Sequence, residues 1–297
     1  MPSMNGNTKD SQHQRVSILV DDSAVHPLDA RDSLGAYLLK LWKRRSFILL
    51  DARARAFQGH RGMWLGKLWI ILNPLVEAAT YGLIFGLLLR TSRGIDNFVG
   101  FLLIGIIFFG FLQQGLNSGA GLIRSNRAMI AAFRFPRASI AIGLVVRQFL
   151  DNLAPALMAV LVALVCQLNK PIDVSVICVV PLYILIHIFS LGLILFVSWL
   201  TAFVPDAKAL LRVVSRGWFY ISGVFFSVEN FATHPVVRSV MQANPGFQFI
   251  NSVRTAVLDG TTPDWRVWVS LLCWSFGSLA VGFLVFWGAE SKYVKVI

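Results

Sequence analysis

Charged residues are scarce in this sequence. Asp, Glu, Lys and Arg make up only 14% of the 297 residues, whereas hydrophobic residues make up 56%. Soluble globular proteins carry about 25% charged residues, so this chain has too few to cover a large apolar core in water. Acidic residues are especially few, 15 against 27 basic ones. A basic excess can indicate nucleic-acid binding, but that partner requires a basic patch on a water-soluble fold, so no nucleic acid is expected.

Cysteine, histidine and catalytic motifs are also lacking. The three cysteines lie inside apolar runs without a CxxC pair, and the five histidines are scattered, which argues against a disulfide framework or a metal site. The segment GHRGMWLGKL resembles a phosphate-binding loop only superficially, because three residues instead of four separate Gly62 from Gly66 and no Ser or Thr follows the lysine. No GxSxG sequence occurs. The sequence predicts no catalytic residues, no metal and no cofactor in this chain.

Long hydrophobic runs dominate the sequence instead. About 20 helical residues cross a bilayer core, and six runs reach or approach this length. The fifth is marginal, because Arg212 and Arg216 interrupt its first two turns. The sequence therefore predicts an all-α membrane protein with six transmembrane helices. The predicted spans are Leu65–Leu89, Phe98–Leu116, Ile140–Cys166, Val174–Val204, Leu210–Val228 and Val267–Trp287.

Basic residues are unevenly distributed around these spans. If the N-terminus is cytoplasmic, 20 of the 27 Lys and Arg residues lie on the cytoplasmic side and 6 in external segments; the 20 include Lys67, Arg212 and Arg216, which lie in the first turns of their spans at the cytoplasmic end. Cytoplasmic loops of membrane proteins are enriched in Lys and Arg, so both termini are predicted to be cytoplasmic. This distribution also explains the net charge of +12 without nucleic acid.

Two kinds of segment precede the first span. Residues 1–32 are polar and lack the apolar region of a signal peptide, which predicts a disordered cytoplasmic tail. Residues 33–60 combine apolar residues at helical spacing with a basic face, which predicts an amphipathic helix in the cytoplasmic membrane interface. The alternative is a solvated basic face that only sets topology. Residues 61–297 are predicted to form the transmembrane domain. The basic residues of the interface helix are Lys40, Lys43, Arg44, Arg45, Arg53 and Arg55.

The region between spans five and six, about residues 229–266, is too apolar for a free loop. Pro235, Pro245 and Gly246 divide it into pieces of about ten residues, each too short to cross a bilayer. Short re-entrant helices on the external side would satisfy their backbone groups internally. Such broken helices resemble the discontinuous elements that transporters place beside their pathway.

Ionisable residues inside the predicted spans are few. Arg147 and Asp151 lie four residues apart and are expected to form an ion pair on one helix face. Glu77 is a single carboxylate, for which a hydrogen bond inside the bundle is favoured over proton coupling. Gly115 and Gly119 have the GxxxG spacing of closely packed helices, within one chain or between two.

Three sequence segments resemble a known family, the transmembrane subunits of type 2 ABC exporters for lipid-linked polysaccharides such as O-antigen, capsule, teichoic acid and galactan. The resemblance covers about residues 33–297. A basic segment leads into GMWLGKLWIILNPL at the first span, SNRAMIAAFRFPR precedes the third span, and ANPGFQFINSVRTAVLDG lies before the sixth. Within the last segment, Asn244, Pro245 and Arg254 match the family's re-entrant motif.

The resemblance implies that residues 124–137 form a coupling helix that contacts an ATPase subunit. The segment is basic and carries Met129, Ile130 and Phe133, which are expected to be exposed and to fit a groove on the partner. A basic loop that only fixes topology is the alternative. The predicted coupling residues are Arg124, Arg127, Met129, Ile130, Phe133, Arg134, Phe135, Pro136 and Arg137.

The resemblance further implies a homodimer in the bacterial cytoplasmic membrane, joined to two cytoplasmic ABC ATPase subunits. ATP and Mg²⁺ would bind to those subunits, so this chain is not expected to be an enzyme. The complex would move a lipid-pyrophosphate-linked glycan from the inner to the outer leaflet. The basic residues of the interface helix can attract the pyrophosphate group.

Aromatic residues make up 12% of the chain. Their faces can pack against sugar rings and still permit sliding, so some of them are expected to line a glycan pathway. Packing against lipid is the alternative reading. The candidates are Tyr81, Phe85, Trp218, Tyr220 and Phe225.

Two other functions remain open at this stage. A type 2 ABC permease for a small drug or lipid would share the fold and the mechanism. An ion-coupled secondary transporter is less favoured, because it would call for more intramembrane charges and an internal repeat. A membrane-bound transferase is disfavoured by the missing acidic and metal-binding residues.

Overall fold

The structure is a computed structural model in which the described residues form helices and turns, with no strand among them. Most of the first predicted span, with Glu77, Tyr81 and Phe85, lies outside the described residues, as do the polar tail, Arg134 and the side chain of Arg55. The structure describes residues 33–56, 69, 72–73, 75–76, 79–80, 83–84, 95–133, 135–167, 170–228 and 234–293.

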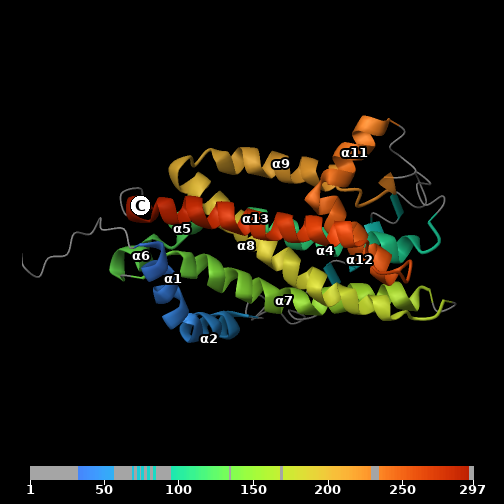
Figure 1. Cartoon of the computed structure of the whole chain (residues 1–297), viewed down its shortest axis with the longest axis horizontal. Helices are drawn as coiled ribbons and strands as arrows, with labels where there is room; N and C mark the ends of the chain where they lie inside the picture. Colours follow the sequence, from blue (N-terminus) through green and yellow to red (C-terminus); the bar gives the residue numbers. More distant parts are fainter. Residues whose placement is uncertain are drawn as a thin grey trace, which may run out of the picture.

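Four helices in the described part of the chain are long and apolar enough to cross a membrane. They coincide with the second, third, fourth and sixth predicted spans and lie lengthwise in one bundle (Figure 1). The chain is therefore a multi-pass membrane protein, as predicted from its hydrophobic runs. The four helices are α4 (Phe98–Gly119), α7 (Ala138–Val165), α8 (Val179–Phe203), which continues the short η4 (Val174–Cys178), and α13 (Trp265–Gly288).

The fifth predicted span forms a shorter helix than the other four. Helix α9 (Ala207–Ile221) has 15 residues, fewer than the roughly 20 that a bilayer core requires. The chain leaves helical geometry just beyond it, where Gly223 adopts a positive φ of 64°. The count of six spans stays a prediction, because α9 is short and most of the first span is not described.

Helix α8 lies at the centre of the bundle and packs against α4, α7 and α13. Small residues permit the closest approaches. A Cβ atom on Gly115 would lie 2.7 Å from Ser190 Cβ, and one on Gly119 would lie 2.8 Å from the Ile194 carbonyl oxygen. The GxxxG pair of α4 therefore serves packing within this chain.

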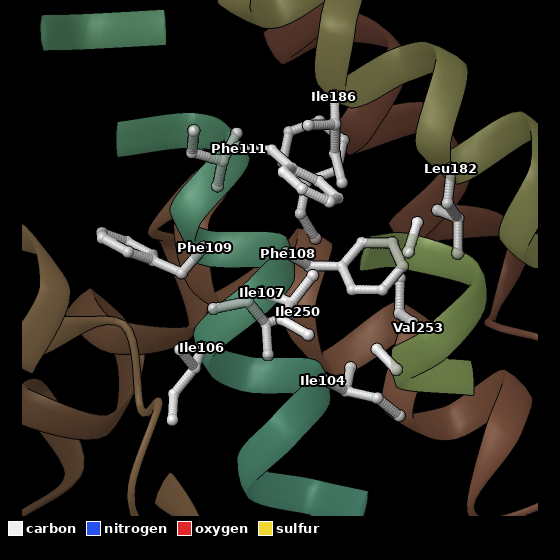
Figure 2. Packing of buried hydrophobic residues seen from close by; sticks show 14 of the residues in the cluster. Ile104, Ile106, Ile107, Phe108, Phe109, Phe111, Leu182, Ile186, Ile250 and Val253 are labelled. Atoms are coloured by element: carbon white, nitrogen blue, oxygen red, sulfur yellow. The ribbon is translucent and has the colours of Figure 1, made fainter. Parts of the chain in front are cut away.

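The largest hydrophobic cluster fills the bundle between α4, α8 and α12. Phe108 and Ile107 of α4 face Leu182 of α8 and Ile250 of α12 in this core (Figure 2). A second cluster lies around Tyr37 and Phe286. Because each cluster joins helices that are distant in sequence, the core fixes the positions of both ends of the bundle.

Short helices gather at the two ends of the bundle (Figure 1). We call the end with α1 and the C-terminal end of the described chain the proximal end, and the opposite end, with α12, the distal end. The proximal end holds the segments predicted to be cytoplasmic. Its short helices are α1 (Leu34–Lys43), α2 (Arg45–Arg55), α5 (Leu122–Ser125), α6 (Arg127–Ala132) and η5 (Glu290–Lys292), and the distal ones are α11 (Pro235–Ala243) and α12 (Pro245–Val257).

Two predicted segments are more divided than expected. The interface helix, predicted as one element, is two helices separated by a turn at Arg44. The predicted coupling helix is also two short helices, α5 and α6, separated at Asn126. In the region before α13, Asn244 and Pro245 separate α11 from α12, as the proline spacing predicts. Whether α11 and α12 enter the membrane stays a prediction.

Candidate functional site

A cavity of about 510 Å³, which we call the proximal cavity, lies between α2, the α5–α6 segment and α7. Its wall contains both Arg44 from the predicted interface helix and Met129 from the predicted coupling segment. The structure thus brings two separately predicted groups of residues to one site. The described residues that line it are Arg44, Phe47, Ile48, Asp51, Ala52, Leu122, Asn126, Met129, Phe133, Phe135, Ser139, Ile140, Gly143, Leu144 and Arg147.

The proximal cavity combines charged and apolar surface. The guanidinium of Arg44 lies 6.0 Å from the centre of the Phe135 ring, within cation–π range. Arg147 forms the predicted ion pair with Asp151, with 3.2 Å between Nε and Oδ2. Phe47 and Phe133 contribute aromatic surface to the same cavity. A cavity with guanidinium groups beside aromatic rings fits a ligand that has an anionic group and an apolar part.

The interface helices expose basic and apolar side chains together. Trp42 and Phe47 are exposed large apolar residues, and Arg45 lies over the Trp42 ring at 4.7 Å. Burying apolar side chains in the bilayer while basic ones contact lipid headgroups is typical of interfacial helices. The predicted headgroup residues whose side chains the structure describes are all exposed: Lys40, Lys43, Arg44, Arg45 and Arg53.

The predicted coupling segment exposes only part of its predicted contact surface. Phe133 is 68% exposed and Arg127 is also exposed, so both are accessible to a partner. The prediction that Ile130 is exposed is wrong: it is 4% exposed, because it packs into the proximal hydrophobic cluster. Arg124 donates a hydrogen bond from Nη2 to the Ala202 carbonyl oxygen at 3.3 Å, which connects the segment to the end of α8.

The remaining predicted coupling residues occupy the connection between α6 and α7. Phe135 is half-buried beside the proximal cavity, and Pro136 is buried. Arg137 is the N-cap residue of α7. A displacement of the exposed part of the segment would therefore be passed directly to the first turn of α7.

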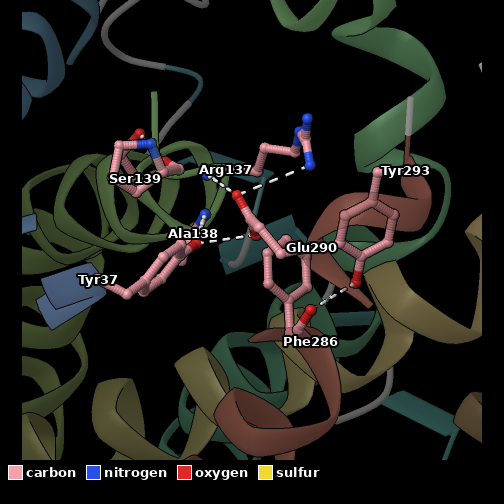
Figure 3. A network of polar contacts seen from close by, with 8 residues as sticks. Tyr37, Arg137, Ala138, Ser139, Phe286, Glu290 and Tyr293 are labelled. Atoms are coloured by element: carbon pink, nitrogen blue, oxygen red, sulfur yellow. Dashed lines mark hydrogen bonds and ion pairs between the residues drawn. The ribbon is translucent and has the colours of Figure 1, made fainter. Parts of the chain in front are cut away.

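Glu290 connects this segment to the interface helix and to the C-terminal end (Figure 3). Its Oε2 accepts a hydrogen bond from the Tyr37 hydroxyl at 2.9 Å, and its Oε1 accepts one from the Arg137 backbone N–H at 2.9 Å. The Tyr37 oxygen in turn accepts a bond from the Ala138 N–H at 3.1 Å. We call these four residues the Glu290 network. A carboxylate at the first N–H groups of α7 also interacts favourably with the helix dipole.

The Glu290 network is enclosed. Tyr37 is 1% exposed. Its burial raises the pKa of the phenol, and the negative charge of Glu290 raises it further, so the hydroxyl remains a donor. Arg137 Nη1 lies 3.8 Å from Glu290 Oε1. Sequence reasoning missed Tyr37 and Glu290, and the only available signal was a lone acidic residue after the last span of a chain with few acids.

At the distal end, Asn244 fixes α12 to α9. Its Oδ1 accepts bonds from Trp218 Nε1 at 2.7 Å and from the Gly246 N–H at 3.0 Å, while its Nδ2 donates to Ser222 Oγ at 2.9 Å. Pro245 occupies the first position of α12, where a missing N–H costs nothing. The Asn-Pro pair therefore forms the start of α12 and positions it against α9.

Arg254 joins three segments at the distal end. It is 3% exposed and donates four hydrogen bonds to carbonyl oxygens: two to Phe101 of α4, one to Gly223 and one to Val224. Gly223 and Val224 follow the end of α9, where carbonyl groups lack helical partners and favour a cation. Gly105 leaves the room that the guanidinium occupies. The described contacts give Arg254 a structural role.

The predicted pathway aromatics differ in their surroundings. Phe225 is buried in the hydrophobic core. Trp218 is half-buried, with its ring 5.2 Å from that of Phe109. Tyr220 is 57% exposed. Of the described candidates, Tyr220 therefore offers the most surface to a ligand, and a pathway role for these residues stays a prediction.

Comparison with known proteins agrees with this architecture. Residues 52–258 match the family model described as ABC-2 type transporter. The O-antigen export system permease protein RfbA of Myxococcus xanthus is 22% identical over 255 residues, which cover 86% of this chain and 94% of that protein. The protein of the same description from Klebsiella pneumoniae is 24% identical over 203 residues, covering 68% and 76%. Because the family model matches more than half of the sequence, the chain belongs to the ABC-2 type transporter family.

Proposed function

We propose that this chain is the membrane subunit of an ATP-driven exporter that moves a lipid-pyrophosphate-linked glycan from the cytoplasmic to the outer leaflet. The observation that carries this proposal is the proximal cavity, which the interface helix and the coupling segment line together. Membership of the ABC-2 family and the O-antigen export relatives support glycan as the cargo. ATP and Mg²⁺ would bind to a separate ATPase subunit.

The exposed part of the coupling segment provides the contact for the ATPase. Phe133 and Arg127 offer one apolar and one basic side chain at the proximal end. A push on this segment reaches the first turn of α7 directly, and the Glu290 network connects that turn to α1. We infer that closure of the ATPase subunits moves α1 and α7 together and so changes the width of the proximal cavity, which lies between α2, the α5–α6 segment and α7.

The proximal cavity suits the membrane-embedded end of the cargo. Arg44 can bind pyrophosphate oxygens, because guanidinium groups form paired, charge-assisted hydrogen bonds with phosphate. Arg147 lines the same cavity, and a pyrophosphate would share its guanidinium with Asp151. Phe47 and Phe133 can contact the first isoprenoid units. Exposed Lys40 and Lys43 add positive potential that attracts the anionic group to this surface.

We further propose that two copies of the chain form the working permease in the bacterial cytoplasmic membrane, with the proximal end cytoplasmic. The distribution of basic residues supports this orientation. Leu210, Val213 and Tyr220 of α9 are exposed, and such apolar side chains must contact either lipid or a second copy. A path between two copies would let a hydrophilic chain cross without contacting lipid tails.

The experiment that tests the proposal is co-purification with a co-expressed ABC ATPase from the same organism, followed by an ATPase assay in nanodiscs. We expect a stable complex whose ATP hydrolysis rises when the cell's own lipid-linked glycan is added. The variant R44E/R147E should lose that stimulation but keep the complex and its basal hydrolysis, and R238E on α11 serves as a charge-reversal control remote from the cavity.

Two results would contradict the proposal. A chain that transports without ATP would indicate a secondary transporter. Stimulation by small drugs or phospholipids, with none by the lipid-linked glycan, would indicate the ABC-2 permease for a small drug or lipid. The second result can be read from the same nanodisc preparation, because only the added substrate changes, whereas transport without ATP must be measured in sealed proteoliposomes.

A further inference from the structure

A second cavity of about 390 Å³ lies at the distal end, and we call it the distal cavity. It is bounded by the start of α4, by α12, by the connection after α7 and by the connection after α9. The helices that bound it, α12 and the start of α4, lie at the opposite end of the bundle from α1 (Figure 1). None of the roles described above uses this cavity, although Arg254 forms part of its wall.

One face of α12 lines the distal cavity. Phe247, Asn251 and Thr255 follow one another at intervals of four residues, which places them on the same side of the helix. Within the described part of the chain, the side chains of Asn251 and Thr255 have no hydrogen-bond partner. Together they offer an amide and a hydroxyl, each able both to donate and to accept, beside an aromatic ring.

The opposite wall contains two amide side chains that are held in place. Asn97 donates from Nδ2 to the Ala163 carbonyl oxygen at 2.8 Å and accepts the Gly100 N–H at 2.9 Å. Gln167 donates from Nε2 to the Val257 carbonyl oxygen at 2.7 Å. Amides fixed in this way keep some hydrogen-bonding capacity for a ligand and lose little entropy when it binds.

The charges of the described residues around the distal cavity are balanced. Lys170 Nζ lies 3.3 Å from Asp96 Oδ2, and Arg254 donates to four backbone carbonyl oxygens. Among the described residues of the lining, Asp259 is the remaining charged one. Because the described lining holds two basic and two acidic residues and both cations are already engaged, it does not favour an anion.

From this lining we propose that the distal cavity binds neutral sugar rings. Sugar hydroxyls both donate and accept hydrogen bonds, as amide and hydroxyl side chains do, and the apolar face of a pyranose packs against an aromatic ring such as Phe247. A volume of about 390 Å³ has room for one or two rings. In the cell, these rings would belong to the exported glycan on the outer side. The identity of the natural ligand therefore rests on the proposed function.

The test measures binding of simple neutral sugars to the purified full-length chain in nanodiscs by saturation-transfer difference NMR. The probes are methyl α-mannoside, methyl β-galactoside, methyl α-rhamnoside and maltose, each at up to about 10 mM, which detects a millimolar Kd. We expect at least one probe to give a signal. The double variant N251L/T255V should weaken its binding about 10-fold or more, because two hydrogen-bonding groups are removed with little change in shape.

A second variant, with a matched control, distinguishes loss of the sugar site from misfolding of the double variant. N251W places a large side chain at an exposed position in the middle of the α12 wall, so it should fill the cavity and abolish the signal. Q242W adds the same bulk to an exposed position of α11 that does not line the cavity, and it should bind like the unaltered chain. Each variant must elute as the unaltered protein does in size-exclusion chromatography before its binding is compared.

Three results would overturn the sugar site: no signal from any neutral probe, equal binding by N251W and Q242W, or tighter binding of glucuronate or glucose 6-phosphate than of the neutral sugars. The assay contains no ATPase and no lipid-linked glycan. Retained sugar binding in a chain that fails to export therefore supports the site while contradicting the proposed function, so the two failures are distinguishable.

Discussion

Replacing Gly105 with alanine should destabilise the protein through one contact. A Cβ atom at this position would overlap Arg254 Nη2 and would lie 2.9 Å from the Val224 carbonyl oxygen. Overpacking of this kind costs about 1–3 kcal/mol, whereas alanine in place of a helical glycine contributes about 0.5–1 kcal/mol of stability. We therefore expect G105A to lower the free energy of unfolding by about 1–2 kcal/mol.

The same substitution should be nearly neutral when Arg254 is shortened. In R254M the guanidinium is gone, so the new methyl group of G105A meets only Val224, and the helix-propensity gain offsets that contact. R254M itself should cost about 2–5 kcal/mol, because Gly223 and Val224 lose a donor and each unsatisfied buried carbonyl costs about 1–3 kcal/mol. A double-mutant cycle of G105A and R254M should therefore give a coupling energy of about 1–2 kcal/mol between positions 105 and 254.

The assay is equilibrium unfolding in mixed micelles, monitored by circular dichroism, of the unaltered chain, G105A, R254M and G105A/R254M. G110A is the matched control, because a Cβ at Gly110 of the same helix meets nothing within 4 Å, and it should be neutral or stabilising. If R254M does not fold, R254K can replace it in the cycle. Additivity of the two substitutions within about 0.5 kcal/mol would refute the packing of Arg254 against Gly105.

Three further predictions concern the proximal end. E290Q keeps the shape of the Glu290 network but removes its charge, so we expect thermal unfolding at a lower temperature and export reduced more than ATP hydrolysis. R127E/F133A removes the exposed contact surface and should abolish co-purification with the ATPase while leaving the unfolding temperature unchanged. I130A should lower the unfolding temperature and keep co-purification, because Ile130 is buried. R44E should weaken binding of vesicles that contain anionic lipid, and raising the salt concentration should diminish the difference from the unaltered chain.

Each of these predictions has an outcome that contradicts it. Equal loss of ATP hydrolysis and export in E290Q would mean that the network only holds the fold together. A complex that survives R127E/F133A would place the ATPase contact elsewhere. Unchanged vesicle binding by R44E would show that Arg44 does not contact anionic lipid headgroups.

The sequence predicted the long helices well because the bilayer imposes a length and a continuous apolar composition on each span. Helix α4 begins at Phe98 and α7 at Ala138, both within two residues of the start of the predicted apolar run. Helix α9 was overestimated, since hydrophobicity alone does not reveal the positive φ of Gly223 that follows its end. The turn at Arg44 was missed because apolar periodicity continues across it.

The site residues were predicted only in part, because segment composition identifies which residues are functional candidates but not which distant segments come together. The Arg and Phe residues of the proximal cavity belong to segments with recognisable composition, so both segments were identified. The hydrogen bonds that connect both segments to Glu290 were not predictable, since Tyr37 and Glu290 are 253 residues apart in the sequence. Arg254 lay in a recognised motif, but its burial was unexpected because arginine is rarely buried without a paired charge; here carbonyl groups stabilise the cation instead.

Transport itself tests the central claim most directly. The chain and its ATPase subunit would be reconstituted into proteoliposomes that carry a fluorescent lipid-linked glycan in the leaflet facing the ATPase. A glycan-cleaving enzyme then reports how much glycan reaches the opposite leaflet. The account predicts transfer that requires ATP and this chain and that decreases strongly in R44E/R147E. Transfer at the same rate without ATP, or no transfer with ATP in an intact complex, would contradict it.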